Sequence, residues 1–398
     1  MRIGIGRFQY SILFAAGLCF MADSMEVLLL SFLSVVLKHE WYLTEHQMDS
    51  IFAVVFAGAL FGTLLLGPAG DIYGRKPIFI LTALIIAISG VITAFCTNYI
   101  QLVIARFFVG FGVGGLTVPF DTLGEFLPTK ARGKNLLYIE FFWTFGTLSV
   151  PLLAYLTLDT TKGGGDGDGE DGGSHWQLFV ILCSVPCFIS TALGVILVPE
   201  SPRWLLESTS HLEDDETGSN KAIDILRYAA LKNELFNSPS RTRLTLLLWS
   251  TWFGLGFLYY GVILAVSIVF TNEEEMEDEA NGGNGNGNGS YDFDYVAIFI
   301  SASSEIFGLI IVLYTIDKFG RISSQTISYR IGGIATFLMD DTTYLHRYIL
   351  IGLAFIARMA MMGASCTTWV STSEILPTDI RSTGHGSANA MARLGGFI

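Results

Sequence analysis

The chain has 398 residues, of which 51% are hydrophobic and 15% are charged, and its formal net charge is −13. Soluble globular domains carry about 25% charged residues, so the composition excludes an ordinary soluble protein and indicates a membrane protein. The acidic excess is local, because twelve acidic residues lie in two stretches rich in Gly or Asn, 163–174 and 271–294. Such stretches cannot form a packed core, so the net charge does not indicate a basic partner.

The apolar stretches predict an all-α membrane protein, because about 20 apolar residues suffice to span a bilayer. Transmembrane helices are predicted at 9–37, 48–68, 77–96, 99–122, 135–158, 176–198, 244–270, 294–316, 323–339 and 347–372, and an eleventh begins near 383. The first stretch is too long for a signal peptide and contains Asp23 and Glu26, so we expect it to remain as the first helix.

The polar segment 199–243 divides the chain. We predict a six-helix bundle at 1–198, a cytoplasmic central loop at 199–243, and a second, incomplete bundle at 244–398. The chain ends inside an apolar helix, so we expect that the second bundle is truncated.

Lysine and arginine residues indicate the orientation in the membrane. Sixteen of the 23 lie at the N-terminus or in the loops after even-numbered helices, whereas Lys38, Lys162 and Arg347 lie in the alternate loops. By the positive-inside rule, the N-terminus is cytoplasmic. Both acidic stretches then face outside or an organelle lumen, where Asn288-Gly289-Ser290 is a candidate N-glycosylation site.

Three short patterns occur in both halves in the same order. Gly70-Asp71-Ile72-Tyr73-Gly74-Arg75-Lys76 has a counterpart in Asp317-Lys318-Phe319-Gly320-Arg321, Ile104-Ala105-Arg106 in Ile356-Ala357-Arg358, and Glu125-Phe126-Leu127-Pro128-Thr129 in Glu374-Ile375-Leu376-Pro377-Thr378. The first pattern and its repeat resemble the loops of the major facilitator superfamily of transporters. The resemblance implies the major facilitator fold of two parallel-repeat helical bundles, here with ten helices plus the start of an eleventh.

Other segments resemble one branch of that superfamily, the synaptic vesicle 2-related proteins. They are Phe20-Met21-Ala22-Asp23-Ser24-Met25-Glu26-Val27, His39-Glu40-Trp41, and Ser304-Glu305. Pro199-Glu200-Ser201-Pro202-Arg203-Trp204 resembles both this branch and the sugar porters.

Charged residues within the predicted membrane helices are the first candidates for a substrate or proton site. They are Asp23, Glu26, Arg106, Glu305 and Arg358. Such charges cost about 2.5–3.5 kcal/mol on insertion scales and usually face a cavity or a partner. Asp23 and Arg106 lie at similar depth at about 1.5 Å per residue. We therefore predict that Asp23 or Glu26 faces Arg106, either as a working carboxylate or as a permanent packing pair, and that Glu305 and Arg358 form a second pair.

A second set of charges lies at the cytoplasmic helix ends, and the resemblance implies that it forms a gate. The set is Asp71, Gly74, Arg75, Glu125 and Arg132 in the first half, and Asp317, Arg321, Glu374 and Arg381 in the second. The alternative is simple topology signalling by basic loops, but acids also repeat and contribute little to that signal.

Glycines and aromatic residues have two interpretations each. Gly110, Gly112, Gly114 and Gly115 favour close helix packing, because a phosphate-binding loop does not fit inside a membrane helix. Aromatic side chains either stack on a planar substrate or anchor helices at the membrane interface. The aromatic candidates are Trp143, Trp252, Tyr259, Tyr260 and Trp369.

These features predict a secondary active transporter that moves a small polar or charged organic solute, such as an organic ion, across a lipid bilayer by alternating access. Proton coupling is chemically feasible because burial and a nearby base tune a carboxylate. The alternative is a non-transporting membrane receptor or vesicle-trafficking protein of the same fold. The sequence has no Ser/His/Asp set, metal cluster or nucleotide motif, so we expect no enzyme activity, no cofactor and no nucleic-acid partner. Plasma membrane and vesicle membrane stay open as locations.

Overall fold

The computed structural model describes residues 6–128, 132–158, 175–202, 204–205, 235–273, 291–339, 347–376 and 381–397. Most of these residues are helical, so the predicted all-α class is confirmed. One short antiparallel hairpin was not predicted, in which β1 (Thr271–Glu273) pairs with β2 (Tyr291–Phe293). The hairpin adjoins the end of a long helix and the start of the next.

The helices of the first half follow the predicted order. They are α1 (Arg7–Trp41), α2 (Glu45–Tyr73), α3 (Arg75–Ala94), α4 (Tyr99–Gly114), α5 (Thr117–Phe126), α6 (Arg132–Leu136), α7 (Ile139–Thr157) and α8 (Trp176–Leu197). The second half contains α11 (Pro239–Val269), α13 (Tyr295–Thr315), α14 (Arg321–Leu338), α15 (Arg347–Ile375) and α16 (Arg381–Phe397). Within the described part of the chain, nine helical segments are long and apolar enough to cross a membrane.

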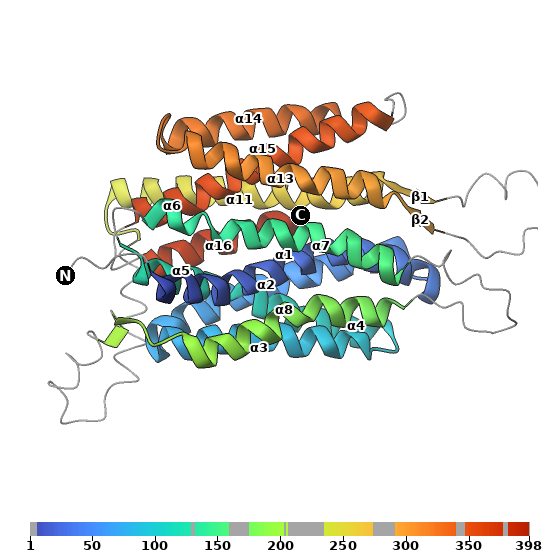
Figure 1. The fold of residues 1–398 in the computed structure, drawn as a ribbon, viewed down its shortest axis with the longest axis horizontal. Helices are drawn as coiled ribbons and strands as arrows, with labels where there is room; N and C mark the ends of the chain where they lie inside the picture. The colour runs from blue at the N-terminus through green and yellow to red at the C-terminus, as the bar shows by residue number, and fades with distance from the viewer. Residues whose placement is uncertain are drawn as a thin grey trace, which may run out of the picture.

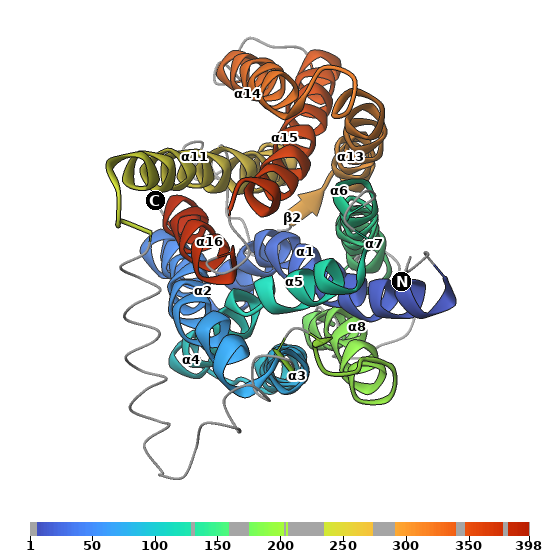
Figure 2. The ribbon, with the colours of Figure 1, turned by 90° about the vertical axis from the view of Figure 1, so that its left-hand side faces the viewer.

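The long helices run side by side along the long axis of the molecule (Figure 1). In the first half, α1 packs on α7 and α8, α2 packs on α4, and α3 packs on both α4 and α8. In the second half, α15 packs on α13 and α14, and α11 packs on α16. The end view in Figure 2 shows α16 between α2 and α11, and α7 beside α13. These two seams join the halves.

The predicted fourth helix is interrupted, which corrects the prediction of one helix at 99–122. α4 ends at Gly114, and α5 begins at Thr117. The Gly114 carbonyl accepts a hydrogen bond from the Thr63 hydroxyl of α2 at 2.9 Å. The Gly115 N–H bonds the Gly112 carbonyl instead of continuing the α-helical pattern. A side chain of a neighbouring helix therefore stabilises the break.

Glycines allow α2 and α4 to approach each other closely. A Cβ on Gly58 would meet the Phe107 carbonyl, and one on Gly110 would meet the Val55 carbonyl. Because the obstacles are backbone atoms, they have no rotamer by which to move aside. The close-packing interpretation of Gly110 and Gly114 fits these contacts, and it brings the charged residue Arg106 of α4 into the helix bundle.

The two ends of the bundle differ in the residues that they carry. We call the end with Arg75, Arg321 and Glu374 the Arg75 end, and the end with the β hairpin the hairpin end (Figure 1). α1 begins at the Arg75 end and crosses the whole bundle. In its most apolar stretch of 18 residues, 94% of the residues are buried. α1 therefore forms the centre of the molecule and holds Asp23 and Glu26 away from the surface.

Candidate functional site

Glu26 and Arg106 form a buried ion pair between α1 and α4. The Glu26 side chain is 2% exposed and that of Arg106 is fully buried. Of the two acids expected to face Arg106, Glu26 is therefore its partner. The Glu26 Oε1 and the Arg106 Nε and Nη2 atoms make no further hydrogen bond within the described residues, so the pair depends on one strong contact.

Asp23 pairs with a residue that the sequence did not single out. The Arg393 Nη2 atom of α16 donates to the Asp23 Oδ2 atom at 3.2 Å. Arg393 also donates to the Tyr260 hydroxyl at 2.7 Å, and its guanidinium lies 5.4 Å from the Tyr260 ring centroid. Of the two acids predicted to face Arg106, Asp23 is therefore not the one that does so. Positions three apart project about 60° from each other around a helix, and this angle turns Asp23 from α4 toward α16.

Glu305 and Arg358 form the second predicted contact. The Arg358 Nη2 and Nε atoms donate to the Glu305 Oε1 atom at 2.7 and 3.2 Å, and both side chains are fully buried. The other Glu305 oxygen accepts a hydrogen bond from the Thr147 hydroxyl of α7 at 2.9 Å. Glu305 thus links α15 of its own half to α7 of the other half.

A small cavity lies between the halves, at the level of Asp23. Its volume is about 20 Å³, which is room for about one water molecule. Six aromatic residues line it, namely Phe20, Trp143, Trp252, Tyr259, Tyr260 and Trp369. All five aromatic candidates from the sequence are among them, which favours a role at a site over anchoring at the membrane interface.

The polar lining of this cavity includes Asp23, Glu140, Asn389 and Arg393. Sequence reasoning missed the last three, although Glu140 and Arg393 are charges in predicted membrane helices. The criterion that selected Asp23 would have found both. Asn389 carries no charge and offers no such signal. The lining residues come from α1, α7, α11, α15 and α16, so both halves contribute.

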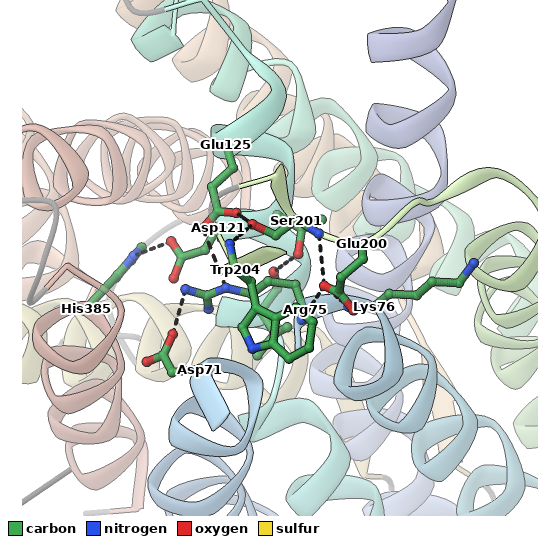
Figure 3. A network of polar contacts seen from close by, with 11 residues as sticks. Asp71, Arg75, Lys76, Asp121, Glu125, Glu200, Ser201, Trp204 and His385 are labelled. Carbon is green, nitrogen blue, oxygen red and sulfur yellow. Dashed lines mark hydrogen bonds and ion pairs between the residues drawn. The ribbon is translucent and has the colours of Figure 1, made fainter. Parts of the chain in front are cut away.

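Arg75 is the centre of a charged network at the Arg75 end (Figure 3). Its Nη2 atom lies 2.7 Å from the Asp71 Oδ1 atom, and its Nε atom lies 3.5 Å from the Glu125 Oε1 atom. The Arg75 side chain is 8% exposed. Glu200 accepts hydrogen bonds from the backbone N–H groups of Arg75 and Lys76 at 2.7 and 3.2 Å. Ser201 donates to Glu125. The network ties the α2–α3 loop to α5 and to the segment after α8.

The repeated loop in the second half makes a more exposed network. The Arg321 Nη1 atom lies 3.0 Å from the Asp317 Oδ1 atom, and its Nε atom lies 2.9 Å from the Glu374 Oε2 atom. The Arg321 side chain is 35% exposed. The two loops therefore share their local ion pairs and differ in packing. The Arg132 and Arg381 side chains and Asn288 lie outside the described residues.

Contacts at the Arg75 end join the halves. The His385 Nδ1 atom of α16 lies 3.4 Å from the Asp121 Oδ1 atom of α5, and Figure 3 shows this pair beside Arg75. The Phe120 and Trp369 rings pack against the His385 ring edge to face and against each other at a tilt, with ring centroids 4.8 to 5.5 Å apart. A Cβ on Gly133 would lie 2.8 Å from the Glu374 Oε1 atom. This end of the cavity is therefore covered by side chains of both halves.

Two helical halves that meet at a buried, charged cavity fit the major facilitator fold. The family model described as "Sugar (and other) transporter" matches residues 19–398, and the chain belongs to this family. It is 30% identical to a synaptic vesicle 2-related protein of Xenopus laevis, over 100% of this chain and 73% of the relative. The predicted resemblance to that branch is confirmed.

Two further similarities agree with this assignment. The chain is 28% identical to organic cation/carnitine transporter 7 of Arabidopsis thaliana, over 100% of this chain and 85% of the relative. Its fold matches the inward-open xylose transporter XylE from E. coli with a TM-score of 0.70 at 20% identity, over 98% of this chain and 88% of that chain. The second match concerns the fold alone.

The Glu26–Arg106 pair is expected to stabilise the first half. Glu26→Gln leaves Arg106 buried without its counter-charge, which costs about 3–5 kcal/mol for a truly buried pair. Glu26→Gln with Arg106→Gln should recover most of this loss. Thermal unfolding in detergent, followed by size-exclusion chromatography, measures both. Glu45→Gln is the matched control. The Glu45 side chain is 82% exposed, and its Oε1 atom lies 3.7 Å from the Lys38 Nζ atom. A double variant no more stable than Glu26→Gln would contradict the role of the pair.

Gly74→Ala should destabilise the chain more than Gly320→Ala. Both glycines have positive φ, +101° and +81°, so alanine costs of order 1–3 kcal/mol at either position. A Cβ on Gly74 would also lie 2.5 Å from the Glu200 carboxylate, whereas one on Gly320 meets nothing within 4 Å. The same unfolding assay compares the two variants. Equal losses of stability would mean that Glu200 does not hold this loop.

Proposed function

We propose that this chain is a secondary active transporter that moves a small polar or charged organic solute by alternating access. The observation that carries the proposal is the cavity that both halves line, with the Asp23–Arg393 ion pair across it. In-membrane charges that face a cavity mark substrate or ion pathways. The cavity holds about one water molecule as it stands, so a solute enters only when the halves separate.

Alternating access then consists of rocking the bundle 1–198 against the bundle 244–398. The contacts that must break at the Arg75 end are Asp121–His385 and the packing of Gly133 on Glu374. The Asp71–Arg75 and Asp317–Arg321 networks lie within their own halves. We assign them the role of fixing the helix ends on which the gate closes.

The names of similar proteins support transport of an organic solute. One relative is an organic cation/carnitine transporter, and structural neighbours include a D-xylose–proton symporter. Proton coupling by a cavity carboxylate fits this setting, because burial and neighbouring charges tune its protonation. The proposal assigns the Arg75 end to the cytoplasm, together with the N-terminus, and the hairpin end with Asn288 to the outside or to a lumen.

Concentrative uptake tests the transport function. Proteoliposomes that contain the chain should accumulate one solute class above the outside concentration, in a screen of organic cations, carboxylic acids and sugars under a proton gradient. Asp23→Asn should abolish the accumulation and leave Arg393 without its counter-charge. Asp23→Asn with Arg393→Gln should recover expression and stay inactive. Wild-type accumulation by the double variant would show that the pair is only structural, and uptake that stops at equal concentrations would exclude active transport.

Labelling of single engineered cysteines tests the orientation. All five native cysteines are buried, and Lys318 and Glu45 are exposed at opposite ends of the bundle. Lys318→Cys should resist an impermeant maleimide in intact cells and react once the plasma membrane is opened. Glu45→Cys should react in intact cells for a surface protein, or only after organelles are opened for an internal one. Reaction of Lys318→Cys in intact cells would reverse the proposed orientation.

A further inference from the structure

Glu140 differs from the other acids at the centre of the bundle. Glu26, Glu305 and Asp23 each form an ion pair with an arginine. Glu140 is 3% exposed, and no basic side chain of the described residues forms an ion pair with it. Its Oε1 atom has no hydrogen-bond partner there. A buried carboxylate without a partner is strongly unfavourable, so Glu140 needs either a proton or a cationic partner at this site.

The neighbours of Glu140 add to its need for a counter-charge. Glu305 and Asp23 lie close enough to interact with it electrostatically, and both are acids. Among the charged residues that line the cavity, two are acids and one is a base. Arg393 is held by Asp23 and Tyr260, so it is not available to Glu140. An anionic solute would meet repulsion from this lining, whereas a monovalent cation would balance it.

The walls of the cavity suit an organic cation better than a bare ion. The Trp143 and Tyr259 rings are tilted by 37° with centroids 5.9 Å apart, and the Trp252 and Trp369 rings meet edge to face with centroids 4.9 Å apart. Aromatic faces attract cations within about 6 Å, and Tyr260 already does so with Arg393 at 5.4 Å. A metal ion would need several oxygen ligands, and the described residues contain no group of three or more metal-binding side chains.

Unpartnered polar atoms indicate what else the ligand carries. The Asn389 Nδ2 and Trp143 Nε1 atoms are buried donors, and the Asp23 Oδ1 atom is a buried acceptor, each without a partner among the described residues. All three residues line the same cavity. A ligand with a hydrogen-bonding group next to its cationic centre would satisfy them, and buried polar groups are rarely left unsatisfied.

We propose, on the basis of the transport function above, that the cavity binds a monovalent organic cation, with Glu140 as its counter-charge and the aromatic side chains stacked around it. Glu140 is then the residue that sets the charge selectivity of the site. Three forms of one ring make matched probes: the N-methylpyridinium form of nicotinamide is a cation, nicotinamide is neutral, and nicotinate is an anion. Each carries a hydrogen-bonding group.

Tryptophan fluorescence reports binding directly, because three tryptophans line the cavity. The wild-type chain in detergent should bind the cation at least about tenfold more tightly than nicotinamide and nicotinate. Glu140→Gln keeps the shape and should weaken cation binding by about 30-fold or more, as expected for the loss of a desolvated charge partner. It should leave nicotinamide binding unchanged. Glu45→Gln makes the same chemical change on an exposed side chain and should alter neither.

Several outcomes would overturn the assignment. The first is equal binding of cation and neutral probe by the wild type, which needs no variant to fold. The second is full cation binding by Glu140→Gln, with or without a loss of proton-driven uptake, because Glu140 would then be a proton site or a packing residue. Glu140→Asp keeps the charge and should retain part of the selectivity, even where Glu140→Gln does not fold.

The same probes separate this proposal from the transport function. Glu140-dependent cation binding without uptake into proteoliposomes would support the cation site and exclude transport of the probe. Concentrative uptake of nicotinate or a sugar without cation binding would exclude the cation site and leave the transport function intact.

Discussion

Buried ion pairs between helices are the interaction on which the rest of this structure depends. Each charge in the bundle is too costly to bury alone, so each pair fixes the relative position of two helices. Glu26–Arg106 joins two helices of the first half, and Glu305–Arg358 joins two helices of the second. Asp23–Arg393 joins the halves. One pair therefore holds each half together, whereas the third can break when the halves separate, without unfolding either of them.

Repeated sequence does not produce equal burial. The loops around Arg75 and Arg321 form the same local ion pairs, because in each the acid precedes a positive-φ glycine and the arginine begins the next helix. Glu200 and Glu125 then add contacts around Arg75 that enclose it, whereas Arg321 gains Glu374 and stays near the surface. The first half has the more rigid helix end, and the second half has the end more open to exchange with water.

Hydropathy and repeats predicted the helices and the Glu305–Arg358 contact, because both depend on position along the helix axis. The partner of Asp23 could not be predicted in this way. Residue counting gives the depth of a side chain and not its direction around the axis, and a helix near the end of the chain supplied Arg393. The break between α4 and α5 was also out of reach, since it depends on the Thr63 hydroxyl of another helix. Glu140 was missed, although its charge lies inside a predicted membrane helix, which is the criterion that selected Asp23.

The size of the cavity connects the ion pairs to transport. A ligand shifts a conformational equilibrium only by its differential affinity for the two states. The closed cavity holds about one water molecule, so a solute binds first to a conformation with the halves apart. Closing then brings Glu140 of the first half near Glu305 of the second, which repels it. We infer that a bound cation removes this repulsion and permits closure around the solute. Arg393 balances the charge of Asp23 in the same way. Charge balance in the cavity thus couples occupancy to the contact between the halves.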